Sequence, residues 1–249
     1  EFHCGLRMTS RKFHKLFGEK PREQGSQIKQ LHMDMAASIQ SITEEIVIKL
    51  ANTLKKETSI ENLSLAGGVA LNCVANGKLL KENIFKNIWI QPASGDAGSA
   101  LGAALIGWYE ISKKSRVINP NDSMKGTFLG CEFKNEEIIS YLKDVDASYE
   151  QLEDDELFEV LVKLINDGKV IGWFSGPMEF GPRALGARSI IGDARNEKMQ
   201  RIMNLKIKYR ESFRPFAPSV LEEDVQNLFD LSLLSPYMLF VAPIKKELR

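Results

Sequence analysis

Between residues 28 and 56 the apolar side chains recur at steps of three and four, which is the spacing of one face of an α-helix. Charged and amide side chains fill most positions between them. The pattern predicts one long helix whose apolar face packs against a core. The apolar stripe consists of Ile28, Leu31, Met35, Ile39, Ile42, Ile46, Leu50 and Leu54.

A shorter pattern then occurs twice. An apolar run at 62–66 leads into the small-residue turn 67–72, which continues as a helix to about residue 82. A second run at 87–91 leads into the turn 92–100, which opens a helix as far as residue 111. Alternating strands and helices predict an α/β architecture.

The polar, turn-rich stretch 113–125 predicts a linker. It sets the expected domain boundary between residues 1–115 and residues 116–249. Beyond it, amphipathic spacing and one apolar run predict four helices and one strand. These are helices at 136–143, 155–167, 197–209 and 222–228, and a strand at 169–174.

The segment after the predicted strand combines arginine, glycine and proline, which indicates a tight, fixed backbone around Arg183 and Arg188. Between residues 183 and 214, nine lysines and arginines stand against three acids, although the whole chain has no net charge. Such a cluster, which includes Lys208, Arg210 and Arg214, favours a phosphate or acyl phosphate ligand. A solvated basic helix face or a weak nucleic-acid patch would give the same charge count, so both stay open.

Glycines in both strand-to-helix turns let the backbone come close to a ligand, and the helix starts that follow attract anions. A nucleotide phosphate or ribose would fit at Gly67 and Gly68. Asn72 adds an amide group that needs a hydrogen-bond partner. Tight turns also use glycine pairs for structural reasons alone, so this alternative stays open.

Asp96 lies at the tip of the second turn, between Gly95 and Gly98. Capping the following helix is the commonest role of aspartate at such a place. The alternative is a ligand to a metal ion that bridges to nucleotide phosphate. The three histidines of the chain have no metal-ligand spacing, so they form no histidine metal site by themselves.

Composition narrows the class of protein. A length of 249 residues with 43% hydrophobic content is typical of a globular protein with one large or two ordinary domains. There is no apolar run of about 18 residues and no signal-peptide pattern, which predicts a cytoplasmic protein with no membrane partner. Three widely spaced cysteines without a CxxC pair indicate neither a disulfide framework nor a zinc ribbon. The missing initiator methionine and the apolar run near the end predict an excised fragment.

Four motifs, in this order, resemble those of the O-carbamoyltransferase family, which includes nodulation-factor and antibiotic-tailoring enzymes. They are LAGGVALN at 65–72, SGDAGSALG at 94–102, GPMEFGPRALGARSI at 176–190 and KYRESFRPFAPS at 208–219. The resemblance runs over nearly the whole chain. It implies a partial actin-like ATPase domain at residues 1–115, followed by a truncated α+β YrdC-like domain at residues 116–249.

The resemblance also implies a reaction. Carbamoyl phosphate and ATP form carbamoyl adenylate in the C-terminal part, and the carbamoyl group passes to an acceptor hydroxyl at the N-terminal part. Asp96 matches a ligand of a divalent metal ion, iron or magnesium. The residues that line the nucleotide are Gly67, Gly68, Val69, Asn72, Gly95 and Gly98. The residues that hold carbamoyl phosphate are Arg183, Arg188, Lys208, Arg210 and Arg214.

The expected partner is a small molecule with a hydroxyl group, a sugar or natural product, and a homodimer is compatible with this picture. An actin-like sugar or acyl kinase would explain residues 61–111 but leaves the cluster at 176–219 without a role. A tRNA-binding modification module would use the cluster to contact phosphates. Nucleic acid is disfavoured, because proline and glycine interrupt the cluster and aromatic side chains do not alternate with the cations.

Overall fold

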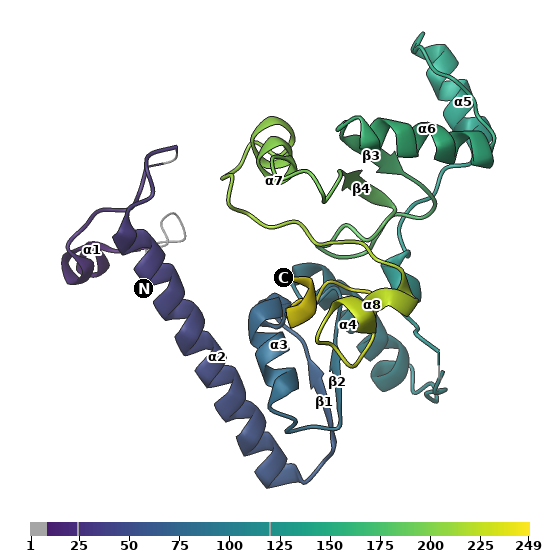
Figure 1. The fold of residues 1–249 in the computed structure, drawn as a ribbon. Coiled ribbons are helices and arrows are strands. Elements are labelled where there is room, and N and C mark those ends of the chain that lie inside the picture. Colours follow the sequence, from purple (N-terminus) through teal and green to yellow (C-terminus); the bar gives the residue numbers. More distant parts are fainter. Residues whose placement is uncertain (1–8, 24, 120) are drawn as a thin grey trace. The chain divides into compact units, whose positions relative to one another are not determined.

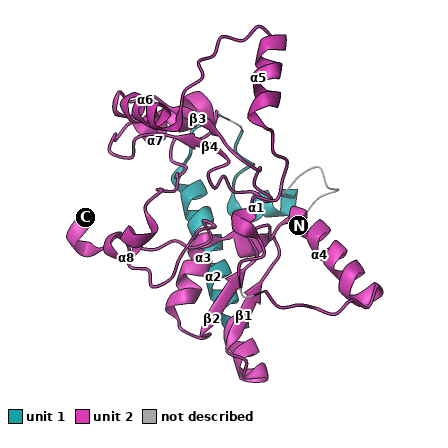
Figure 2. Ribbon diagram, turned by 90° about the vertical axis from the view of Figure 1, so that its right-hand side faces the viewer, with its two compact units in different colours: residues 1–50 teal, residues 51–249 magenta. Residues whose placement is uncertain are grey.

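The computed structural model describes residues 9–23, 25–119 and 121–249. The chain forms two compact units, Glu1–Leu50 and Ala51–Arg249 (Figure 2). His3 and Cys4 lie outside the described residues. Across the described ranges, no helix combines the length and apolarity that crossing a bilayer requires.

The first unit contains α1 (Arg11–Phe17) and most of α2 (Gln30–Thr58). α2 confirms the predicted long helix. Its apolar stripe, however, is largely exposed, with exposed fractions of 62% at Ile39 and 59% at Leu50. The described residues of the first unit therefore supply no core for the stripe, and its predicted packing stays a prediction. Periodicity identifies the apolar face of a helix, but it does not tell whether this chain also supplies the element that covers that face.

The second unit opens with the two predicted strand–turn–helix repeats, which are confirmed (Figure 1). β1 and β2 pair in parallel, with Leu65 opposite Ile90. Parallel strands end at the same edge of a sheet, so the two glycine turns that follow them are neighbours. In chain order the elements are β1 (Asn62–Leu65), η1 (Gly68–Leu71), α3 (Cys73–Lys81), β2 (Asn87–Ile90), α4 (Asp96–Ile106) and the π turn η2 (Gly107–Ile111).

The rest of the unit carries a second, antiparallel pair of strands, β3 (Ile171–Phe174) and β4 (Arg188–Ile191). β3 was predicted, but β4 was expected to belong to the arginine loop. The predicted helix at 197–209 is shorter and ends in a π turn. The remaining elements are η3 (Lys125–Thr127), α5 (Asn135–Asp144), α6 (Asp154–Asn166), α7 (Met199–Ile202), the π turn η4 (Met203–Ile207), η5 (Glu222–Asp224), α8 (Val225–Leu228) and η6 (Lys246–Leu248).

The core of the second unit joins segments that are far apart in the sequence. Ile90 of β2 packs with Tyr237 and Leu239 from near the C-terminus, and all three are buried. Gly77 of α3 allows this approach, because a Cβ there would lie 2.2 Å from the carbonyl oxygen of Val241. The C-terminal segment is thus fixed beside the glycine turns.

Candidate functional site

The first glycine turn follows β1 directly. Gly67 has φ 92° and ψ 158°, a conformation that side-chain-bearing residues rarely adopt. Gly68 has no such constraint, and a Cβ at either glycine would meet no atom within 4 Å. Asn72 is the N-cap of α3, since its side-chain oxygen accepts from the backbone N–H of Ala75 at 3.1 Å. The cap explains the amide oxygen, and nucleotide contacts by Asn72 and by the exposed Val69 stay predictions.

The second glycine turn places Asp96 at the first position of α4, so Gly95 and not Asp96 is the N-cap. The Asp96 side chain is exposed, and no described residue forms a hydrogen bond or ion pair with its carboxylate. Gly98 has a packing reason, because a Cβ there would lie 2.0 Å from the carbonyl oxygen of Ala93. A Cβ at Gly95 would lie 3.8 Å from the side chain of Leu71, which places the two turns side by side.

A metal site at Asp96 would need further ligands. Within residues 9–23, 25–119 and 121–249, no three histidine, cysteine, aspartate or glutamate side chains are grouped as a metal ion requires. The donors of the described residues therefore do not by themselves fit iron or magnesium. A metal ligand role for Asp96 stays a prediction that depends on donors from outside this set.

Glu179 organises the arginine loop, here defined as residues 176–187. Its side chain is 8% exposed, and one carboxylate oxygen accepts from the backbone N–H groups of Leu185, Ala187 and Arg188 at 2.7, 2.9 and 3.3 Å. Burial alone would raise the pKa of Glu179, but these backbone hydrogen bonds outweigh it and the pKa is lowered. Neither charge counting nor motif spacing pointed to this residue. The available signal was a lone acid inside a cationic, glycine-rich loop.

Arg183 connects this loop to the first glycine turn. One Nη atom donates to the carbonyl oxygen of Leu71 at 3.0 Å, and the buried Nε atom has no hydrogen-bond partner among the described residues. Gly181, with φ 137°, brings the same loop against the second turn, where its Cβ position lies 3.4 Å from the carbonyl oxygen of Pro92. The cavity that Arg183 and Pro92 line is too small for a water molecule. The buried side of the guanidinium thus has no room for a water molecule or a ligand in this conformation.

Arg188 is part of β4 and holds the hairpin closed. One of its Nη atoms donates to the carbonyl oxygens of Ser175, Gly176 and Ala187 at 3.3, 3.0 and 2.9 Å. The guanidinium also stacks on Phe174, with its central carbon 3.4 Å from the ring centroid. This contact is a cation–π interaction across the paired strands. Arg188 therefore has a structural role that the sequence did not indicate, and its predicted contact with carbamoyl phosphate stays a prediction.

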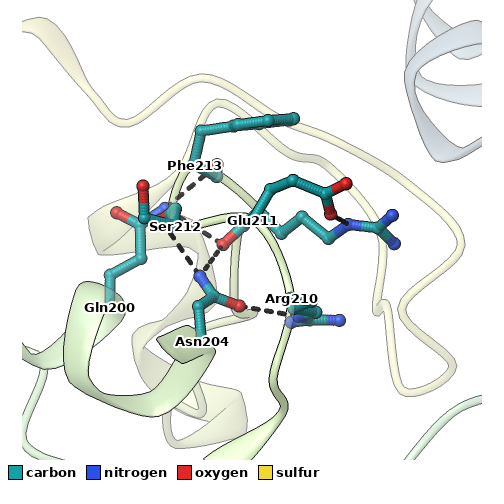
Figure 3. A network of polar contacts seen from close by, with 7 residues as sticks. Gln200, Asn204, Arg210, Glu211, Ser212 and Phe213 are labelled. Atoms are coloured by element: carbon teal, nitrogen blue, oxygen red, sulfur yellow. Dashed lines mark hydrogen bonds and ion pairs between the residues drawn. The ribbon is translucent and has the colours of Figure 1, made fainter. Parts of the chain in front are cut away.

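Lys208, Arg210 and Arg214 lie on one loop after η4, which we call the cationic loop (residues 208–214). The side-chain amides of Gln200 and Asn204 both donate to backbone carbonyl oxygens of this loop (Figure 3). Arg210 donates from Nε to the side-chain oxygen of Asn204 at 2.6 Å, and Arg214 pairs with Glu211 at 3.0 Å. Lys208 is exposed. The structure thus gathers three of the five predicted cations.

The other two predicted cations are placed differently. Arg183 touches the glycine turns and Arg188 the β3–β4 hairpin. The carbonyl oxygens to which they donate belong to other segments, and none of these acceptors lies in the cationic loop. The predicted site is therefore represented by two groups, the cationic loop and the junction between Arg183 and the glycine turns.

The glycine turns and the five predicted cations match two different family models. Residues 1–105, with the glycine turns, match the family model described as carbamoyltransferase N-terminus. Residues 162–249, with all five cations, match the model described as carbamoyltransferase C-terminus. The chain belongs to the carbamoyltransferase family.

Relatives in three bacteria share this sequence along most of its length. An uncharacterised protein of Synechocystis sp. is 58% identical and matches all of the chain. Nodulation protein NolNO of Sinorhizobium fredii is 40% identical over 92% of the chain, and nodulation protein NolO of Bradyrhizobium diazoefficiens is 38% identical over 90%. The chain spans only 41%, 34% and 41% of these three proteins, respectively.

Proposed function

We propose that the chain is part of an O-carbamoyltransferase that uses carbamoyl phosphate and ATP, by way of carbamoyl adenylate, to modify the hydroxyl group of a small molecule such as a sugar or natural product. Family membership supports carbamoyl transfer. The observation that carries the proposal is the contact between Arg183 and Leu71. This contact joins the arginine-rich C-terminal region of the chain to the first glycine turn of its N-terminal region. The anion site and the nucleotide site would then be neighbours.

The proposed reaction has three steps. Hydrolysis of carbamoyl phosphate gives carbamate and phosphate. A carbamate oxygen then attacks the α phosphorus of ATP, the bond from this phosphorus to the bridging oxygen breaks, and pyrophosphate leaves. Finally the acceptor hydroxyl attacks the carbamoyl carbon, loses its proton and releases AMP.

The cationic loop would serve the first two steps. Both place several negative charges close together, and fixed cations stabilise such a transition state most when charge develops on it. Arg210 suits this role best among the arginines, because its Nη atoms donate to no described residue and its Nε partner is a neutral amide, whereas Arg214 is paired with the carboxylate of Glu211. Lys208 and Arg214 would add charge beside it. Arg183 and Arg188 would contribute through the part of each guanidinium that faces solvent.

The glycine turns would hold nucleotide. Gly67 and Gly98 are explained by backbone conformation and by packing, but Gly68 and Gly95 are explained by neither. A Cβ at Gly68 would meet no atom within 4 Å, and one at Gly95 would meet only the Leu71 side chain at 3.8 Å. Accessible backbone at a helix start is the arrangement that phosphate groups use. We therefore assign Gly68 and Gly95 the closest approach to ATP, with Gly67, Val69, Asn72 and Gly98 around them.

The remaining assignments follow from the same proposal. Residues 1–115 would be part of an actin-like ATPase domain and residues 116–249 part of a YrdC-like domain. Asp96 would join metal ligands supplied from outside the described residues. The reaction would take place in the cytoplasm, where ATP is available. We expect the 249-residue chain alone to bind phosphate weakly and to transfer no carbamoyl group.

Exchange of labelled pyrophosphate into ATP tests the proposal, in a protein of the relatives' length that contains this chain. We expect exchange that depends on carbamoyl phosphate. Arg210→Ala should reduce it at least about a hundredfold, because one preorganised donor contributes about 3 kcal/mol to such a barrier. Arg201→Ala, at an exposed arginine outside the predicted set, is the matched control. Exchange that continues without carbamoyl phosphate, or equal loss in both variants, would overturn the proposal.

A further inference from the structure

Asn204 is the most completely buried polar side chain of the cationic region, with an exposed fraction of 0%. Its Nδ2 atom donates to the carbonyl oxygens of Ser212 and Arg214 at 3.1 and 2.8 Å. Its Oδ1 atom accepts from Nε of Arg210 at 2.6 Å (Figure 3). An amide has two N–H donors and one carbonyl acceptor, so every polar atom of this side chain is engaged with the cationic loop.

The backbone around Asn204 is unusual in two ways that serve the same contacts. The helix widens into the π turn η4, in which the N–H of Lys208 donates to the carbonyl oxygen of Met203 at 2.9 Å. The chain then reverses at Tyr209, which has φ 47° and is 86% exposed. The N–H of Arg210 returns to the carbonyl oxygen of Asn204 at 3.0 Å. π turns and positive φ values outside glycine persist where surrounding contacts hold them, often at functional sites.

These contacts fix one edge of Arg210 and leave the other open. Its Nε is held by Asn204, and its guanidinium carbon lies 4.9 Å from the ring centroid of Phe216. No described residue accepts a hydrogen bond from its Nη groups. A guanidinium held at Nε and along its face presents the Nη pair as a fork, which is the geometry that binds two phosphate or carboxylate oxygens at once.

We propose that Asn204 is a positioning residue that orients Arg210 toward an anionic substrate, and this inference rests on the anion site of the proposed function. Gln200 provides a comparison within the same network. Its side chain also donates to the cationic loop, at the carbonyl oxygens of Phe213 and Arg214, but it makes no hydrogen bond with Arg210. If Asn204 only supported the loop backbone, the two amides would be equivalent.

The experiment measures the affinity of the 249-residue chain for inorganic phosphate by calorimetry at one fixed ionic strength, because screening alters such affinities. Arg210→Ala should weaken binding at least about tenfold, the effect of one charge-assisted hydrogen bond. Asn204→Ala should weaken it about tenfold as well, and Gln200→Ala less than about twofold. The double variant of Asn204 and Arg210 should bind no more weakly than Arg210→Ala alone, since residues that act through one another are not additive.

The outcomes separate the inference from the proposed function. If Arg210→Ala binds phosphate as the wild type does, the anion site is wrong and Asn204 has nothing to position. If Arg210→Ala weakens binding but Asn204→Ala matches Gln200→Ala, or if the double variant shows the full sum, the inference alone is overturned. Arg210→Lys keeps the charge without the fork and needs no change in the buried amide. Wild-type affinity in Arg210→Lys would also overturn the inference, even if Asn204→Ala failed to fold.

Discussion

Replacement of Glu179 tests whether one buried carboxylate holds the arginine loop in place. Its oxygen accepts three backbone N–H groups, two of them within 2.9 Å. A hydrogen bond to a charged group contributes about 1.5–3 kcal/mol, and an N–H left unpaired in a buried site costs a similar amount. Counting the two short bonds, we expect Glu179→Ala to lower the free energy of unfolding by about 4 kcal/mol. Glu179→Gln should cost about 2 kcal/mol, because a neutral oxygen still accepts.

The effect of Glu179 should depend on pH in a defined direction. The pKa of Glu179 is lowered in the folded chain, so its contribution to stability is fully present above the ordinary glutamate pKa of about 4.3. It is lost as the pH falls through the lowered, folded-state pKa. The difference in unfolding free energy between wild type and Glu179→Gln should therefore stay constant from about pH 7 to pH 5 and shrink in more acidic solution.

Urea unfolding at several pH values gives this difference, and hydrogen exchange at the Leu185 and Ala187 amides reports on the loop itself. Both amides should exchange faster in Glu179→Gln than in the wild type. Glu132→Gln, at an exposed position, is the matched control and should change neither quantity. A stability difference that persists unchanged to pH 3, or unaltered exchange at both amides, would refute the reasoning.

Three further predictions concern the glycine turns and the hairpin. Gly98→Ala should lower the melting temperature by about 6 °C or more, since its Cβ would lie 2.0 Å from the Ala93 carbonyl oxygen, whereas Gly68→Ala should shift it by less than about 1 °C; equal shifts would contradict the packing argument. Arg188→Ala and Arg188→Lys should each lower the free energy of unfolding in urea by about 2 kcal/mol, because an ammonium group cannot replace the hydrogen-bonded, stacked guanidinium. Full stability in the lysine variant would contradict this. Asp96→Asn should change the free energy of unfolding by less than about 0.5 kcal/mol. Any loss of carbamoyl transfer by this variant in a longer protein would then reflect ligand binding and not folding.

The first half of the second unit could be predicted because its signals are local. The runs that become β1 and β2 each end at small residues, and the turn glycines lie where the strand–helix transitions require them. Strand β4 could not be predicted in this way. Its extended backbone depends on pairing with β3. The path of the chain that leads into β4 depends on the backbone N–H groups that donate to Glu179. Neither partner is a sequence neighbour of Arg188–Ile191.

The candidate site could also be predicted only in part, from its charge but not from its geometry. Counting cations identified a candidate region, whose function stays a prediction, and the family models confirm the carbamoyltransferase resemblance. The count could not distinguish Arg188, whose side chain donates to four carbonyl oxygens, from Arg210, whose side chain makes one hydrogen bond. Nor could it identify Asn204, because the contacts of this amide with residues 210–214 depend on the π turn, which the sequence did not predict.

The cations differ in the number of N–H donors that each still offers a ligand. An arginine has five N–H donors and a lysine three. Arg188 donates to carbonyl oxygens of the hairpin and Arg183 donates to Leu71. Both arginines therefore stabilise the fold and keep fewer N–H donors for a ligand. Arg210 keeps its Nη pair open, with Lys208 exposed two residues away. An anion that approaches the chain would thus be bound first by the cationic loop, and the strength of that binding would depend on how rigidly Asn204 and the π turn hold the loop. On this proposal, charge would determine where the anion binds, and a neutral buried amide would determine how tightly it is bound.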